Sequence, residues 1–147
     1  MNYNFVPSER FFELLYLEPE FCESIGKIML IAGSLESHLK RYLRARGVQG
    51  VRDNSTLGAL VQLLKEKNLL SPNGEMHFMD LAHKRNYLAH NLYGLFHHEI
   101  EETILPRSKL VELDVEMFCE RARDLARDFE YFRNIVAGAK SGTSVLL

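Results

Sequence analysis

The stretch SIGKIMLIAGSLESHLKRYL, residues 24–43, decides the fold class of this 147-residue chain. Its apolar residues recur every three or four positions, which is the period of one face of an α-helix. We expect this helix to begin at Pro19 and to end at Gly47, because proline suits the first position of a helix and glycine the position after its end. The apolar face consists of Ile25, Ile28, Met29, Ala32, Leu35, Leu39, Tyr42 and Leu43.

The sequence also predicts loops and additional helices on both sides of this helix. A loop rich in Gly, Asn and Asp follows it at 47–56, and SPNG at 71–74 is expected to form a turn. Between His97 and Leu113 the pattern fits either a loop or a short hairpin. The additional helices are expected after an N-cap at Ser8, after Ser55 or Thr56, from about Glu75 to Leu95, and after an N-cap at Asp114.

Short connections between amphipathic helices predict an all-α fold, an antiparallel bundle of about four to five helices. The chain has the size of one domain, and no internal repeat or linker divides it. We therefore predict a single domain over residues 1–147, with its core at about 20–135, a short helix near its N-terminus and a frayed C-terminal tail.

The composition is ordinary for a globular protein, with 46% hydrophobic and 26% charged residues and a net charge of −2. Nucleic acid would therefore have to bind a local basic patch, or a patch formed by two copies. The longest apolar run, IMLIAG at 28–33, is too short to cross a membrane. Cys22 and Cys119 are expected to be buried, reduced thiols of a cytoplasmic protein, with a disulfide as the alternative.

The stretch HKRNYLAHNLY, residues 83–93, places an arginine on the apolar stripe of its helix. Because arginine stays charged, a buried Arg85 requires a carboxylate, and Glu36 is the best candidate if the two helices pack antiparallel. The alternative is that Arg85 extends to solvent from the edge of the core and that His90 is a half-buried core histidine. The stripe consists of Phe78, Leu81, Arg85, Leu88, Leu92 and Leu95.

A second stripe of the same helix is polar and contains His83, Asn86, His90 and Tyr93. His83, His90 and His97 repeat every seven residues, but this places them about 10 Å apart along a helix, too far to share one metal ion. The sequence also lacks a glycine loop of the phosphate-binding type. We therefore expect no metal site and no other cofactor.

A basic segment lies at the C-terminal end of the long helix. Its simplest interpretation is a solvated helix end, where cations complement the helix dipole. A weaker interpretation is a track for RNA phosphates. The segment contains Lys40, Arg41, Arg44 and Arg46.

Residues 85–90, Arg-Asn-Tyr-Leu-Ala-His, resemble the Arg-polar-x-x-x-His motif of the HEPN superfamily (higher eukaryotes and prokaryotes nucleotide-binding). The segments STLGALVQLL at 55–64 and AGSLESHLKRYL at 32–43 resemble prokaryotic members, and the similarity covers about residues 20–135. The resemblance implies a helical bundle that forms a homodimer, with two motifs meeting across a cleft. It also implies a metal-independent endoribonuclease, often a toxin or an antiviral defence effector.

Carried onto this chain, the resemblance makes Arg85 and His90 the catalytic pair, Asn86 their polar companion and Glu36 an orienting acid, with His83 and Tyr93 in support. The histidine would transfer protons near neutral pH while a ribose 2′-OH attacks the neighbouring phosphate. The arginine would stabilise charge on the phosphoryl oxygens.

The implied partners are a second copy of the chain, RNA, and an antitoxin such as a nucleotidyltransferase. In the subgroup paired with nucleotidyltransferases, a tyrosine that becomes adenylylated lies two residues after the histidine, whereas this chain has Leu92 there and Tyr93 next. The alternative to an enzyme is a non-catalytic HEPN-like scaffold for dimerisation or partner binding.

Overall fold

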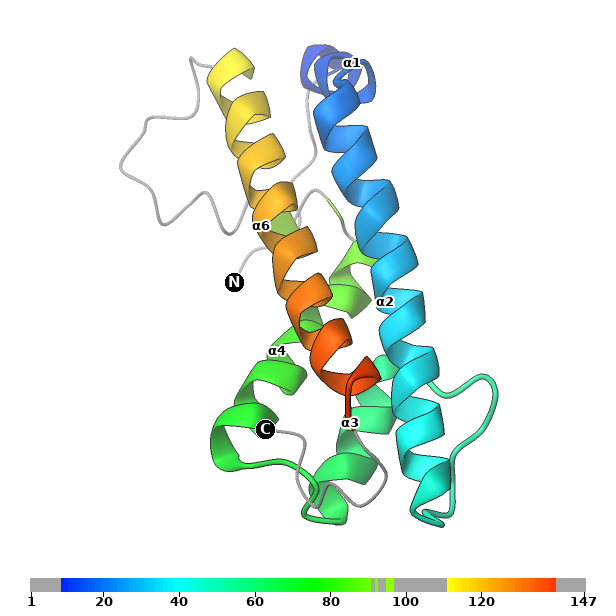
Figure 1. Ribbon diagram of the computed structural model, residues 1–147. Helices are drawn as coiled ribbons and strands as arrows, with labels where there is room; N and C mark the ends of the chain where they lie inside the picture. The colour runs from blue at the N-terminus through cyan, green and yellow to red at the C-terminus, as the bar shows by residue number, and fades with distance from the viewer. Residues whose placement is uncertain (1–8, 91, 93–94, 97–110, 140–147) are drawn as a thin grey trace. The chain divides into compact units, whose positions relative to one another are not determined.

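A computed structural model describes residues 9–90, 92, 95–96 and 111–139, and within them it contains five helices and no strand (Figure 1). The predicted all-α class is therefore confirmed for this part of the chain. The expectations for Ser8, for residues 97–110 of the loop or hairpin and for the tail at 140–147 lie outside the described residues. At 111–113 the expected loop or hairpin is wrong, because these residues begin a helix. The helices are α1 (Glu9–Tyr16), α2 (Pro19–Ala45), α3 (Leu57–Glu66), α4 (Pro72–His90) and α6 (Val111–Ala137).

Helix α2 begins and ends as the sequence predicts. Gly47 has φ +67°, a left-handed conformation that glycine adopts without strain. Its N–H donates to the carbonyl of Arg44 (3.0 Å), and the N–H of Val48 donates to the carbonyl of Leu43 (3.2 Å). These two bonds form a Schellman motif, which satisfies carbonyls at the helix end that would otherwise lack partners.

Helix α3 is capped at both ends by its own sequence. The Thr56 hydroxyl accepts a hydrogen bond from the N–H of Ala59 (3.2 Å), so Thr56 is the N-cap. At the other end Asn68 adopts φ 53°, and its N–H and that of Leu69 donate to the carbonyls of Lys65 and Leu64. Asparagine here takes the position that glycine takes after α2.

Helix α4 begins three residues before the predicted start, so the expectation that SPNG forms a separate turn is wrong. The Ser71 hydroxyl accepts a hydrogen bond from the N–H of Gly74 (3.1 Å), and the Ser71 carbonyl accepts one from Glu75 (2.8 Å). Serine is thus the N-cap and Pro72 the first helical residue, where its missing N–H loses no bond. The turn residues proved to be a helix start.

The expected N-cap at Asp114 is also wrong, because α6 begins at Val111. Asp114 instead lies in the first turn of the helix, half-buried. A carboxylate is favourable there, since it faces the partial positive charge of the helix N-terminus. A residue type that suits an N-cap suits the first turn as well, which is why the sequence did not separate the two positions.

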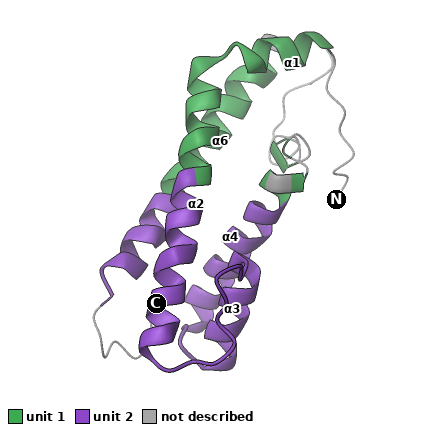
Figure 2. Ribbon diagram, turned by 90° about the vertical axis from the view of Figure 1, so that its right-hand side faces the viewer, with its two compact units in different colours: residues 1–29, 87–128 green, residues 30–86, 129–147 purple. Residues whose placement is uncertain are grey.

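The described residues divide into two compact units, each with its own apolar core (Figure 2). Unit 1 comprises Met1–Met29 and Tyr87–Asp128 as far as they are described. Its core contains phenylalanine rings at centroid distances of 5.0–6.2 Å, within the range of favourable aromatic contacts. The rings are those of Phe11, Phe21, Phe96 and Phe118.

Unit 2 comprises Leu30–Asn86 and Phe129–Leu147 as far as they are described. Within it, α2 and α4 run in opposite directions, whereas α2 and α6 run side by side in the same direction (Figure 1). Arg133 of α6 donates its Nε–H to the Ser34 hydroxyl of α2 (3.0 Å). The buried core of unit 2 includes Leu35, Leu39, Leu43, Leu57, Leu60, Leu64, Phe78, Leu81, Phe129 and Phe132.

Two expectations about α2 are wrong at its N-terminal half. Met29 is 43% exposed although it was assigned to the apolar face, and Cys22 is exposed although it was expected to be buried. The buried positions there are Phe21, Ser24 and Ile28, which follow the spacing i, i+3, i+7 and leave both residues beside the stripe.

Candidate functional site

The predicted apolar stripe is buried at its phenylalanine and at three of its leucines, whereas Arg85 and Leu92 are half-buried. Phe78, Leu81 and Leu88 are buried, while Arg85 is half-buried. Because Arg85 lies between buried leucines on this stripe, its side chain begins at the core and its guanidinium lies at the rim of the core. Arg85 therefore occupies a position where its charge needs a partner.

That partner is Glu36 of α2, as the sequence predicts. The Nε of Arg85 lies 3.7 Å from Oε1 of Glu36, and the two side chains are 25% and 20% exposed. Nε is itself buried and makes no hydrogen bond to any described residue. At this distance the attraction is a charge pair rather than a hydrogen bond, so Glu36 compensates the charge without saturating the guanidinium.

The polar stripe of α4 faces solvent. His83, Asn86 and His90 are exposed, which is contrary to the alternative of a half-buried core histidine at position 90. Tyr93 lies outside the described residues. Arg85 and Asn86 belong to unit 2, whereas His90 belongs to unit 1.

Two residues of the basic segment hold a neighbouring loop. Lys40 donates from Nζ to the carbonyl of Asp53 (2.6 Å), and Nη2 of Arg44 donates to Oδ1 of Asp53 (2.8 Å). These contacts tie the loop after α2 back onto the helix. They account for two of the four cations that were predicted to contact RNA phosphates.

The other two cations lie beside a histidine and a tyrosine that the sequence analysis did not assign to a site. Nη2 of Arg41 lies 2.6 Å from Nδ1 of His38, and the guanidinium of Arg46 stacks 3.6 Å from the centroid of the Tyr42 ring. Burial lowers the pKa of His38, and the charges of Arg41 and Arg133 lower it further. The sequence contains a signal for both contacts, because His38 and Arg41 are three residues apart and Tyr42 and Arg46 are four residues apart, so each pair lies on one side of the helix.

The two cysteines differ in exposure. Cys119 is buried, and burial is the largest of the effects that raise the pKa of its thiol to about 11. A thiol with that pKa is protonated at neutral pH and therefore a poor nucleophile. The exposed Cys22 directs its Sγ toward the carbonyls of Leu15 and Tyr16, at 3.6 and 3.5 Å.

Among the described residues, no three His, Cys, Asp or Glu side chains are close enough to hold a metal ion. No helix in the same part of the chain combines the length and the apolar character needed to span a membrane. Comparison with protein-family models, with curated proteins and with solved structures gives no significant match.

Proposed function

We propose that this protein is a metal-independent endoribonuclease of HEPN type that acts as a cytoplasmic homodimer in toxin–antitoxin or antiviral defence. One observation carries the proposal. Within unit 2, Glu36 compensates a half-buried Arg85 at the rim of the core, and the neighbouring Asn86 is exposed. The motif's histidine, His90, is exposed as well. An arginine held at the edge of solvent can still receive a phosphate, which a fully buried ion pair cannot.

Each residue has a distinct task in this proposal. Arg85 stabilises the charge that develops on the phosphoryl oxygens, and Glu36 orients the guanidinium. His90 transfers a proton, because imidazole titrates near neutral pH. Asn86, four residues before His90 on the helix, orients the imidazole or binds a phosphate oxygen.

A second copy of the chain would bring two such motifs together. Met76 and Met79 of α4 are 60% and 46% exposed, and they continue the face that carries His83, Asn86 and His90. Exposed methionine next to polar groups suits a protein interface, since methionine adapts its shape to a partner. In this proposal the dimer contact includes α4.

The competing function is a HEPN-like scaffold that binds a partner without catalysis. One observation favours it. Lys40 and Arg44 are engaged by Asp53, so the basic segment offers RNA fewer uncommitted cations than its sequence suggests. A scaffold needs the dimer but not the cations.

The deciding experiment is RNA cleavage by the purified protein in excess EDTA, with the Arg85→Ala and His90→Ala variants beside it. Matched controls are Arg127→Ala, an exposed arginine of α6, and His77→Ala, an exposed histidine of α4. We expect 2′,3′-cyclic phosphate and 5′-OH ends from RNA and no cleavage of DNA, because DNA lacks the attacking 2′-OH.

Three results would contradict the enzyme. They are activity abolished by EDTA, products with 3′-OH and 5′-phosphate ends, or His90→Ala as active as the two controls. A dimer by light scattering that cuts no RNA would support the scaffold, and a monomer at micromolar concentration would count against both.

A further inference from the structure

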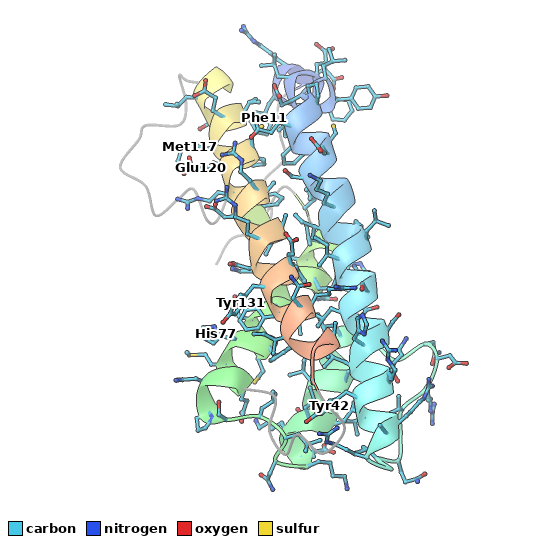
Figure 3. All side chains as sticks on the ribbon, in the orientation of Figure 1. Phe11, Tyr42, His77, Met117, Glu120 and Tyr131 are labelled. Carbon is cyan, nitrogen blue, oxygen red and sulfur yellow. The ribbon has the colours of Figure 1, made fainter. Side chains whose placement is uncertain are left out.

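Unit 2 contains a cavity of about 280 Å³ between the C-terminal ends of α2 and α6. Figure 3 shows Tyr42 on the side of α2 that faces the end of α6. Three small apolar residues, Val136, Ala137 and Ala139, line the cavity from the α6 side. From α2 it is lined chiefly by polar or charged side chains, those of His38, Arg41, Tyr42 and Arg46.

The charge of this cavity is positive. Its described lining contains two arginines and no acidic residue. The C-terminal ends of α2 and α6 repel an anion, because each carries about half a negative charge. One carbonyl at the end of α2, that of Tyr42, also accepts a hydrogen bond from Arg46. Two full positive charges therefore exceed the two partial negative ones.

Arg46 is the least satisfied cation of the cavity. Its guanidinium stacks on Tyr42 and donates one weak hydrogen bond from Nη1 to the Tyr42 carbonyl (3.4 Å). Nη2 is buried and makes no hydrogen bond to any described residue. A buried N–H group without an acceptor is unfavourable, so the fold leaves this guanidinium incompletely satisfied.

His38 holds the second arginine in place. Because arginine has only donors, the 2.6 Å contact requires that Nδ1 of His38 accept the bond from Nη2 of Arg41. The imidazole is then neutral and carries its proton on Nε2, a further donor beside the cavity. Burial, followed by the charges of Arg41 and Arg133, lowers the pKa of His38, which agrees with a neutral imidazole.

We propose that this cavity binds a small phosphate monoester, with Arg41 and Arg46 on the phosphate oxygens and His38 positioning Arg41. Two guanidinium groups match a dianion, whereas a carboxylate requires only one. The volume admits a phosphate with a group of sugar size. None of Glu36, Arg85 and His90 lines the cavity, so this proposal does not depend on ribonuclease activity.

An adjacent cavity gives an internal control. It is lined by Lys40, Arg41 and Arg44 but also by Asp53, whose carboxylate pairs with Arg44. Arg44 is thus a cation of the same helix, a few residues from Arg46, that lies outside the proposed site and already has an anionic partner.

The test is calorimetric titration of the purified protein with ribose 5-phosphate, inorganic phosphate, sulfate and acetate at constant ionic strength. We expect ribose 5-phosphate to bind with a Kd of about 1 mM or tighter. Arg46→Gln and Arg41→Gln should each weaken it about ten-fold or more, the scale of one lost charged hydrogen bond, while Arg44→Gln stays within about two-fold. Arg46→Lys, which keeps the charge but not the planar fork, should fall between.

The sources of the phosphate separate in the same titrations. If inorganic phosphate binds as tightly as ribose 5-phosphate, the site is one for the free ion. If ribose 5-phosphate binds more tightly, the site is one for a phosphate monoester. Either result supports a phosphate site. Three results would overturn the phosphate site. They are acetate binding as tightly as inorganic phosphate or ribose 5-phosphate, no binding of any probe at about 10 mM, and equal losses of affinity in Arg44→Gln and Arg46→Gln. Circular dichroism of each variant shows whether the fold is kept, and Arg41→Gln, an exposed position, tests the site even if Arg46→Gln unfolds.

Discussion

Arg85 and Arg46 are two half-buried arginines of unit 2, and each has one buried nitrogen without a hydrogen bond. They differ in what compensates the charge. Arg85 faces the carboxylate of Glu36, whereas Arg46 lies over the ring of Tyr42. A carboxylate neutralises the cation and fixes its position, while an aromatic face stabilises it and leaves its charge in place. The partner, more than the burial, decides what each arginine can still bind.

The largest expected effect separates the two arginines by chemistry. Arg85→Lys should reduce the rate of RNA cleavage by about 10²–10³, because a compact ammonium replaces a planar fork that stabilises charge in the transition state. Arg46→Lys should leave that rate within about two-fold. Single-turnover cleavage of a labelled RNA measures both. Equal losses would mean that the two sites do not act separately.

The next effect concerns stability at Arg85. Glu36→Ala leaves a half-buried guanidinium without its carboxylate and should lower the free energy of unfolding by about 1–3 kcal/mol, between the values for exposed and buried pairs. Urea denaturation measures the change. Glu23→Ala is the control, since its contact with Lys27 is an exposed i, i+4 pair on α2 worth about 0.3–0.5 kcal/mol. A loss no larger than that of the control would show that Arg85 needs no compensation.

A smaller effect is expected at Arg46. Arg46→Met should cost about 0.5–1 kcal/mol, because it removes the contact with Tyr42 but strands no opposite charge. Arg85→Met should cost more, since it leaves Glu36 without its cation. Thermal or urea unfolding of the two variants gives the order. The reverse order would mean that the aromatic ring compensates a cation better than the carboxylate does.

The smallest effect is a dependence of stability on pH through His38. Its pKa in the folded protein lies below the usual value of 6.5, so the unfolded chain binds more protons between those two values. The free energy of unfolding should therefore decrease as the pH falls through that interval, and His38→Gln should show a weaker decrease. Denaturation at pH 7.5 and 5.5 tests this, and an NMR titration of His38 with a midpoint above 6.5 would contradict it.

Sequence periodicity was sufficient for the helices and for one contact in the site. An arginine at position 85 of an apolar stripe requires an acid, and Glu36 was the acid within reach on the facing helix. Periodicity did not identify the cavity beside Arg46, because it depends on α6 ending next to α2, more than ninety positions later in the chain. It also misplaced two helix starts, since Ser71 and Asp114 each suit more than one position at a helix N-terminus.

The side-by-side course of α2 and α6 has a consequence for synthesis on the ribosome. The hydrogen bond between Arg133 and Ser34 joins residues 99 positions apart, and Phe129 and Phe132 complete the core of unit 2. At about 5–20 residues per second, the interval between the emergence of α2 and that of α6 is on the order of ten seconds. During it the apolar face of α2 lacks its final cover, so we expect the nascent chain to expose apolar surface until α6 emerges.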